Sequence, residues 1–107
     1  MATKQKRFKP QYLPLFWDDL NSAVTYISDV LHATEAAERL IDQVENGILE
    51  HLHNPTMAAM YQTTQGRPLT YYWFEVGNYM VFYVIFDDVI EVRRFVYGSR
   101  DLTKMIP

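Results

Sequence analysis

The chain has 107 residues, of which 49% are hydrophobic, 15% aromatic and 21% charged, and it contains no cysteine. This composition excludes a disordered chain, a disulfide framework and a thiolate metal site, and the length predicts a single domain over residues 1–107. There is no signal-peptide core and no run of membrane-spanning length, so we expect a soluble, cytoplasmic protein without membrane contact.

Charge is distributed unevenly behind the formal net charge of −3. Between residues 18 and 50, Arg39 is the only lysine or arginine among many acids: Asp18, Asp19, Asp29, Glu35, Glu38, Asp42, Glu45 and Glu50. Basic residues predominate outside that segment: Lys4, Lys6, Arg7, Lys9, Arg67, Arg93, Arg94, Arg100 and Lys104. The net charge of the whole chain therefore describes neither the acidic segment nor the basic segments that flank it.

The acidic segment has the periodicity of helices. Apolar residues are spaced by three and four positions in residues 20–31 and again in residues 37–52, which predicts two amphipathic helices. The break between them lies at residues 32–34, where Thr34 is expected to cap the second helix and Glu35 to favour its N-terminal end. So short a connection predicts an antiparallel helical hairpin.

The segments that flank the hairpin are less regular. Residues 8–13 are interpreted as a short strand, which Pro10 restricts to the edge of a sheet. Pro14 is expected to open the first helix, and Asn54-Pro55 to stop the second. The polar residues 56–67 then predict a loop with at most one helical turn.

The hydrophobic period changes to that of strands after this loop. Three runs rich in β-branched and aromatic residues, 69–76, 79–86 and 89–97, are joined by the two-residue connections Gly77-Asn78 and Asp87-Asp88. They predict a three-stranded antiparallel meander. The whole chain is therefore expected to be an α+β domain, with the helical hairpin packed on a three- to four-stranded, mainly antiparallel sheet that has the N-terminal strand at its edge.

Neither face of the predicted sheet is polar. Alternation divides the middle strand into Met80, Phe82, Val84 and Phe86 on one face and Tyr79, Val81, Tyr83 and Ile85 on the other. Two helices cover one face only, so we expect aromatic residues of the other face to form an apolar surface for a partner chain. The alternative is that the N-terminal strand, the loop and the last residues fold over that face.

The last strand contains two adjacent arginines, Arg93 and Arg94. One alternation places Ile90, Val92 and Val96 under the helices and Glu91, Arg93, Phe95 and Tyr97 on the opposite face. Arg94 then lies on the packed side unless a β-bulge reverses it. This mixture of guanidinium and aromatic groups suits either bases and phosphates or an acidic, hydrophobic peptide. The alternative is that each arginine pairs with Glu91, Glu75 or the acidic helices.

The predicted elements contain landmarks in a definite order: Pro14 with Asp19-Leu20, Tyr26-Ile27, Ala37-Glu38-Arg39-Leu40, Asn78-Tyr79 with Phe82-Tyr83, and Tyr97-Gly98-Ser99-Arg100-Asp101. With these landmarks the chain resembles, from about residue 8 to residue 106, the RelE/ParE toxins of bacterial type II toxin-antitoxin (plasmid stabilisation) modules. The resemblance implies the RelE/ParE-like fold and a growth-arresting toxin. It also implies a cognate antitoxin whose disordered segment folds along the toxin.

The family divides between ribonucleases that cleave mRNA on the ribosome and proteins that inhibit DNA gyrase. RelE-like ribonucleases carry lysines on the first meander strand, one arginine beside the middle-strand tyrosine, another after the last-strand glycine, and a tyrosine near the C-terminus. Only Arg100 matches this set, and Tyr97 stands where many relatives have histidine. The other positions hold Tyr71, Trp73, Met80 and Ile106.

These departures favour a ParE-like gyrase inhibitor. The alternatives are a RelE-like ribosome-dependent mRNA endoribonuclease and a non-toxic module that only binds the antitoxin, so whether the protein is an enzyme stays open. In a ribonuclease, Arg100 and Tyr97 would be catalytic. The expected target-binding cluster adds Arg93 and Arg94 to those two residues.

The remaining assignments concern partners and cofactors. Antitoxin contact is assigned to four aromatic residues: Tyr79, Tyr83, Trp73 and Phe95. The three histidines, His32, His51 and His53, do not share a face, so neither a metal site nor a cofactor is expected. The expected partners are the antitoxin and either gyrase or the ribosome with its mRNA, and both a homodimer and a toxin-antitoxin hetero-oligomer fit the sequence.

Overall fold

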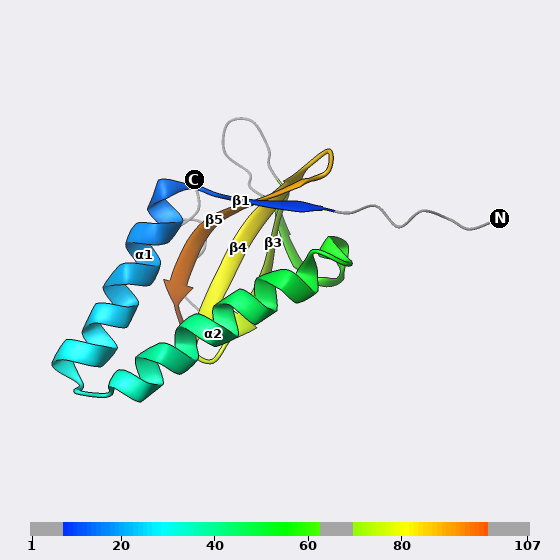
Figure 1. Cartoon of the computed structure of the whole chain (residues 1–107). Helices are drawn as coiled ribbons and strands as arrows, with labels where there is room; N and C mark the ends of the chain where they lie inside the picture. Colours follow the sequence, from blue (N-terminus) through cyan, green and yellow to red (C-terminus); the bar gives the residue numbers. More distant parts are fainter. Residues whose placement is uncertain (1–7, 63–69, 99–107) are drawn as a thin grey trace.

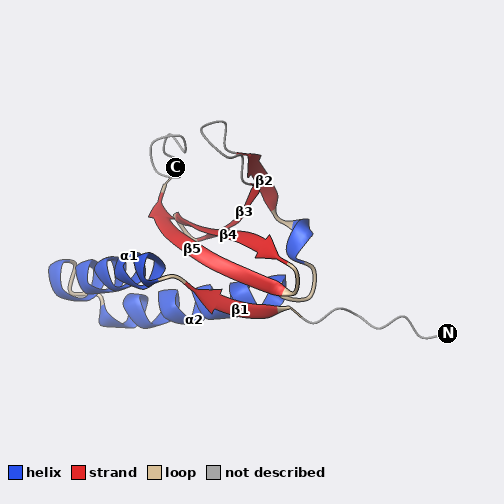
Figure 2. Ribbon diagram, turned by 90° about the horizontal axis from the view of Figure 1, so that it is seen from above, coloured by secondary structure: helices blue, strands red, loops and turns tan. Residues whose placement is uncertain are grey.

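The computed structural model describes residues 8–62 and 70–98 of the chain. The elements in chain order are β1 (Lys9–Tyr12), α1 (Pro14–Thr25), the π-helical turn η1 (Tyr26–Val30), α2 (Thr34–His51), the 3-10 turn η2 (Pro55–Met57), β2 (Ala59–Gln62), β3 (Thr70–Val76), β4 (Tyr79–Phe86) and β5 (Val89–Tyr97). Both helices lie on one side of a twisted sheet (Figure 1, Figure 2). The predicted α+β fold is confirmed, with five strands where three or four were expected.

The sheet has the strand order β1-β5-β4-β3-β2, in which β1 is parallel to β5 and the other neighbours are antiparallel. The meander of β3, β4 and β5 and the edge position of the N-terminal strand are confirmed. The loop predicted for residues 56–67 is wrong at residues 59–62, which form β2. Ala59 pairs with Trp73, so pairing with a strand distant in sequence makes this segment extended.

The helical hairpin forms as predicted, with one difference at the start of α2. Pro14 is the first residue of α1. The backbone N–H at this position would have no acceptor within the helix, so proline loses no helical hydrogen bond there. The chain reverses through His32, whose φ of 53° lies in the left-handed region. Ala33 is the N-cap of α2 and makes no side-chain cap, so the prediction that Thr34 caps this helix is wrong. Glu35 lies in the first turn as expected.

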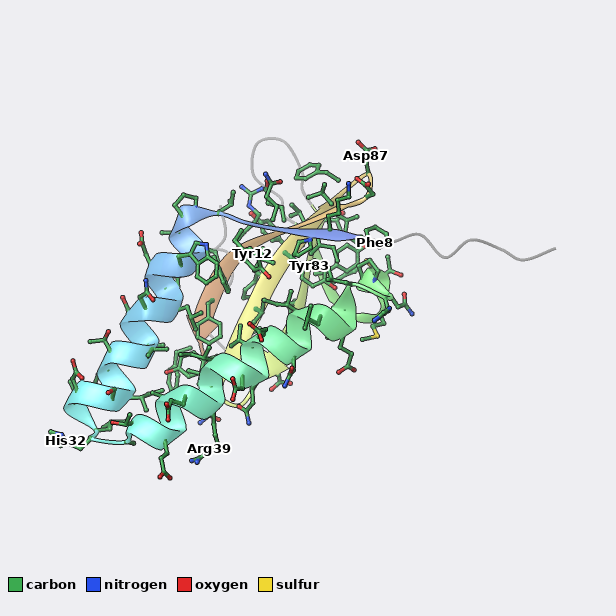
Figure 3. All side chains as sticks on the ribbon, viewed as in Figure 1. Phe8, Tyr12, His32, Arg39, Tyr83 and Asp87 are labelled. Carbon is green, nitrogen blue, oxygen red and sulfur yellow. The ribbon has the colours of Figure 1, made fainter. Side chains whose placement is uncertain are left out.

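The main core lies between the helices and the sheet. Its buried residues are Phe16, Leu20, Leu40, Val44, Ile48, Val76, Val81, Tyr83, Ile90, Val92 and Phe95. The Tyr83 hydroxyl donates to the carbonyl oxygen of Pro55, shortly after α2 has ended at His51. Burial raises the pKa of the Tyr83 phenol, so it stays protonated and ties β4 to the segment after α2. Figure 3 shows Tyr83 in the opening between α1 and α2.

The opposite face of the sheet is also buried at its centre. Its second cluster comprises Tyr71, Met80, Phe82, Val84 and Val96, with Trp73 packed against it. Phe82 is 0% exposed and Tyr71 is 2% exposed. The alternation predicted for the middle strand is therefore confirmed. The expectation of an open apolar surface is wrong at these positions, because they are buried within the chain itself.

A β-bulge interrupts the pairing of β4 with β5. Phe82 pairs with Arg94, but the next residue of β4, Tyr83, pairs with Val92. Arg93 is therefore the extra residue, with no partner of its own across the strand pair. An inserted residue reverses the in-and-out alternation for everything that follows it.

The bulge decides which residues of β5 face the helices. Ile90 and Val92 pack under the helices as predicted. Beyond the bulge, Phe95 belongs to the helix-side core and Val96 to the second cluster. The prediction that placed Val96 under the helices and Phe95 on the opposite face is wrong, because the inserted residue exchanges the two faces.

Asp19 on α1 fixes the part of β5 that lies beyond the bulge. β1 ends opposite Val92, so the outer edge of β5 after that residue faces no strand among the described residues. There, Asp19 Oδ2 accepts the Phe95 N–H at 3.0 Å and the Arg94 Nε–H at 2.7 Å, and Oδ1 accepts Arg94 Nη2–H at 3.2 Å. A helix carboxylate thus takes the place of a neighbouring strand and draws the Arg94 guanidinium toward α1.

α2 approaches β3 closely at Gly47. A Cβ at this position would lie 2.6 Å from Cε2 of Phe74, which is shorter than van der Waals contact. The Phe74 ring stacks on the His51 ring with centroids 4.0 Å apart, and His51 Nδ1–H donates to the Gly47 carbonyl oxygen at 2.7 Å. Glycine is therefore required for packing, although it is a poor helix former.

Asp19→Ala should lower the free energy of unfolding by about 2–4 kcal/mol, because a mostly buried guanidinium and a backbone N–H lose one acceptor together. Asp19→Asn, which keeps an oxygen but not the charge, should cost about 1–2 kcal/mol. Urea unfolding measures both losses. The control is Asp18→Asn at the neighbouring exposed carboxylate, which should change stability by less than about 0.5 kcal/mol. Equal losses at the two positions would contradict the role given to Asp19.

Gly47→Ala should lower the free energy of unfolding by about 1–2 kcal/mol, since the clash with Phe74 outweighs the gain in helix propensity. The same urea titration on Asn46→Ala supplies the control, because Asn46 is the exposed preceding residue of the same helix. If Gly47→Ala is at least as stable as Asn46→Ala, then α2 and β3 are not in close contact there.

Candidate functional site

The two adjacent arginines of β5 have different partners. Arg94 is held by Asp19 beside α1. Arg93 Nη1–H donates to Glu91 Oε1 at 3.1 Å, and its guanidinium carbon lies 5.7 Å from the centre of the Tyr71 ring. The alternative in which each arginine pairs with Glu91 or with the acidic helices is therefore confirmed.

The structure does not bring the predicted target-binding residues into one cluster. Arg93 lies against Glu91 and the Tyr71 ring, whereas the Arg94 guanidinium turns toward the edge of the sheet at Asp19. Arg100 lies outside the described residues. Tyr97, at the end of β5, is 55% exposed. A role in target binding stays a prediction for all four, and Tyr97 has the largest free surface among those that the structure describes.

The four residues assigned to the antitoxin are also divided. Tyr83 and Phe95 are 1% and 4% exposed in the helix-side core, so neither side chain offers a contact surface. Trp73 packs against the second cluster on the other face of the sheet. Tyr79 is partly exposed at the start of β4. The antitoxin assignment stays a prediction, and burial argues against it for Tyr83 and Phe95.

A row of aromatic rings leads from the core to the surface at the end of β5. The Tyr79 ring stacks on Phe95, with centroids 4.6 Å apart and an interplanar angle of 10°. Tyr97 meets Tyr79 edge to face, with centroids 5.2 Å apart. Because Phe95 is fixed through its N–H by Asp19, the whole row is positioned by the contact between α1 and β5.

The β3-β4 turn completes this region. Gly77 connects the strands with a φ of 59°, a conformation that glycine adopts without strain. Gly98, with a φ of 73°, donates its N–H to the carbonyl oxygen of Asn78 at 2.7 Å. This bond holds the end of β5 against the turn and places Tyr97 beside Asn78.

Two hollows flank these residues. The larger is a groove of about 740 Å³ between α1 with its π-helical turn and the end of β5, lined by Asp19, Ser22, Ala23, Tyr26, Ile27, Leu31, Asn78, Tyr79, Phe95 and Tyr97. The smaller hollow, of about 410 Å³, is lined by Trp73, Glu75, Gly77, Asn78, Tyr79, Met80, Tyr97 and Gly98. Asn78, Tyr79 and Tyr97 line both and form the ridge between them.

The phenol of Tyr79 is unsuited to act as a base. Burial, together with the neighbouring phenols of Tyr97 and Tyr26, raises the pKa of Tyr79 above its usual value. The group therefore stays protonated at neutral pH and is available as a hydrogen-bond donor. With Asn78 beside it, the ridge has the character of a binding surface, apolar in the ring faces and polar at the tips.

Sequence reasoning gave no functional role to three residues of this region: Asp19, Tyr26 and Asn78. Asp19 is one of several acids on α1, and only the bulge brings Phe95 N–H and Arg94 to it. Tyr26 lies just past α1, in the π-helical turn, where its ring is 52% exposed. In the sequence, the only indication of a role for Tyr26 is its position at the end of an apolar helix face, and this indication is weak.

Two further observations limit the chemistry of the part of the chain that the structure describes. No three histidine, aspartate or glutamate side chains in residues 8–62 and 70–98 gather as metal ligands. Neither α1 nor α2 is long and apolar enough to cross a membrane.

Comparison with known proteins identifies the family. The sequence model of the ParE toxin of the type II toxin-antitoxin system, parDE, matches residues 11–102. Among solved structures, the chromosomal ParDE toxin-antitoxin system from P. aeruginosa is similar with a TM-score of 0.68, covering 88% of this chain and 99% of that chain at 11% identity, which shows a shared fold. No curated protein sequence matches the chain. Because the family model spans both helices and the sheet from β2 to β5, this chain belongs to the ParE toxin family of type II toxin-antitoxin systems.

Proposed function

We propose that this chain is a toxin that arrests growth by inhibiting DNA gyrase in the cytoplasm and that a cognate antitoxin neutralises it. Its place in the ParE toxin family supports both the toxin role and an antitoxin partner. The choice of gyrase over the ribosome rests on one observation. Three positions at which RelE-like ribonucleases carry cations hold the uncharged residues Tyr71, Trp73 and Met80 here, and these residues pack into the second cluster of the sheet.

Tyr71, Trp73 and Met80 do not supply the groups that RNA cleavage requires. Metal-free cleavage of RNA needs a base for the 2′-hydroxyl, an acid for the leaving oxygen, and fixed cations around the phosphate. Tyr71 and Met80 are buried, and Trp73 packs against them. None of these three side chains supplies a positive charge, and the burial of Tyr71 and Met80 keeps both from a substrate.

The described arginines of β5 do not replace the missing cations. The charge of Arg93 is offset by Glu91 and that of Arg94 by Asp19. A phosphate would have to displace a carboxylate from either guanidinium before it could bind there. The exposed ridge of Asn78, Tyr79 and Tyr97 instead offers aromatic and amide groups, which supports recognition of a protein target.

Inducible expression in a bacterial host, with pulse labelling of DNA and protein synthesis, tests the choice of target. DNA synthesis should fall first, within minutes, while translation continues. Purified protein should also inhibit supercoiling by gyrase and leave ribosome-bound mRNA intact. An early stop in translation with cleaved mRNA would overturn the gyrase proposal and favour the ribonuclease. Absence of toxicity with retained antitoxin binding would favour the binding module.

Single substitutions test which groups face the target. Tyr97→Ala, Arg93→Ala and Arg100→Ala should each reduce killing at equal soluble expression, with Tyr97→Ala losing roughly tenfold or more, because exposed aromatic residues dominate protein contacts. Tyr97→Phe should keep most activity. Asp42→Ala on the exposed side of α2 is the control. If all three variants kill as the wild type does, the target-facing surface lies elsewhere.

A further inference from the structure

The two edges of the sheet differ in what protects them from pairing with another chain. β1 and β2 are the edge strands, at opposite ends of the strand order (Figure 2). β1 contains Lys9 and Pro10, and both residues are exposed. A lysine, and a proline that has no backbone N–H to donate, are features with which proteins keep a sheet edge from accepting a further strand. β1 is therefore a protected edge.

β2 has neither of these features. Its residues Ala59–Gln62 include no charged residue and no proline, and the sequence holds no lysine, arginine, histidine, aspartate or glutamate anywhere in residues 54–66. β2 pairs with β3 on its inner side, and no strand among residues 8–62 and 70–98 lies on its outer side. Alternate residues of a strand direct their N–H and C=O groups to opposite sides, so half of those of β2 point outward. The sequence of β2 therefore does not protect this edge against pairing.

A row of side chains on the helix side of the sheet ends at Met60. Tyr83 of β4 is 1% exposed, and the Tyr72 ring of β3 stacks on it with centroids 5.7 Å apart. Met60 pairs with Tyr72, and directly opposite residues of paired strands point to the same face, so Met60 is next in this row. Met60 is 68% exposed, more than any other large hydrophobic residue that the structure describes. A further strand beside β2 would continue the row and cover Met60.

The turn before β2 adds a second exposed methionine on this side. The carbonyl oxygen of Pro55 in η2 accepts the Tyr83 hydroxyl, which places η2 on the helix side of the sheet. Met57 of the same turn is 48% exposed. Methionine side chains are flexible and polarizable, and they recur on surfaces that bind other proteins. Met57 and Met60 therefore give the margin of the sheet beside β2 an apolar character.

A second copy of β2 satisfies the geometry of this edge. Two antiparallel copies of one strand are related by a twofold axis perpendicular to the sheet, and each outward N–H then meets a C=O of the other copy. Directly opposite residues point to the same face, so the axis must set one residue opposite its own copy. An axis at Met60 makes the two Met60 side chains cover each other. No like charges oppose this contact within β2, whereas a charged partner strand would find no opposite charge in residues 54–66.

We propose that two copies of this chain pair through β2, antiparallel and with Met60 opposite Met60, so that their sheets join into one sheet of ten strands. The backbone hydrogen bonds of β2 form the centre of the contact, and the helices of both copies lie on the same side of the joined sheet. β2 pairs with residues 70–73 of β3, whereas the ridge at Asn78 and Tyr97 lies beyond the other end of that strand. The dimer therefore leaves the ridge exposed, and the proposal does not depend on the choice of target.

A single cysteine tests the register, because the chain has no cysteine of its own. The Cβ atoms of directly opposite residues lie about 4.5–5.5 Å apart, close to the separation that a disulfide requires. Under mild oxidation with copper phenanthroline, Met60→Cys should therefore form a disulfide-linked dimer. The control is Gln11→Cys at an exposed residue of β1, the protected edge. It should cross-link about tenfold more slowly or less, because only pairing raises the effective concentration of the thiols.

Sedimentation velocity of the purified full-length chain tests the dimer itself. The wild type should dimerise at about 100 µM, and Met60→Lys or Met60→Glu should each weaken association about tenfold or more, because like charges would lie directly opposite each other. An equimolar mixture of the two variants should form a heterodimer, since the lysine of one copy then faces the glutamate of the other. Leu49→Lys, at a residue of α2 that is 50% exposed, is the matched control and should dimerise as the wild type does.

Three results would overturn the proposal. The first is a wild-type chain that is monomeric at about 100 µM; if its co-expressed antitoxin is lost on Met60→Lys, the edge of β2 binds the antitoxin instead. The second is a Met60→Lys variant that dimerises as strongly as the wild type, and the third is cross-linking of Met60→Cys no faster than that of Gln11→Cys. Circular dichroism and cooperative urea unfolding first show that each variant is folded, as expected for changes at exposed side chains.

Discussion

One carboxylate, that of Asp19, joins the helical hairpin to the far end of β5, and the candidate site depends on this contact. β1 stops opposite Val92, so the rest of β5 would otherwise present an open edge to solvent. Asp19 accepts the Phe95 N–H and the Arg94 guanidinium on that edge. The same contact sets the spacing between α1 and the strand, which is the width of the groove that Tyr26, Tyr79 and Tyr97 line.

Each of the two described arginines of β5 has a carboxylate partner. Arg93 forms an ion pair with Glu91, and Arg94 forms one with Asp19. Both guanidinium groups are therefore engaged in ion pairs within the chain. Within the described part of β5, the two arginines therefore add no unpaired positive charge to the surface.

The chain belongs to the ParE toxin family and shares the fold of a ParDE system. A fold by itself does not specify an activity, so the chemistry has to be argued from individual residues. In this chain the second face of the sheet is filled by Tyr71, Phe82 and their neighbours. Burial there contributes stability and keeps these side chains from solvent. The ridge at Asn78 and Tyr97, by contrast, is exposed.

The sequence by itself determined the helical hairpin, the meander and the two-sided apolar middle strand, because helix and strand periods and turn residues such as Gly77 act over a few neighbouring positions. The order of short motifs along the chain, from Pro14 to Asp101, also indicated the family. Only the tertiary structure decided the pairing of β2 with β3, the bulge at Arg93, and hence the exchange of Phe95 and Val96 between faces. These features depend on register between segments far apart in the chain, and shifting register by one residue leaves the local pattern of the sequence unchanged.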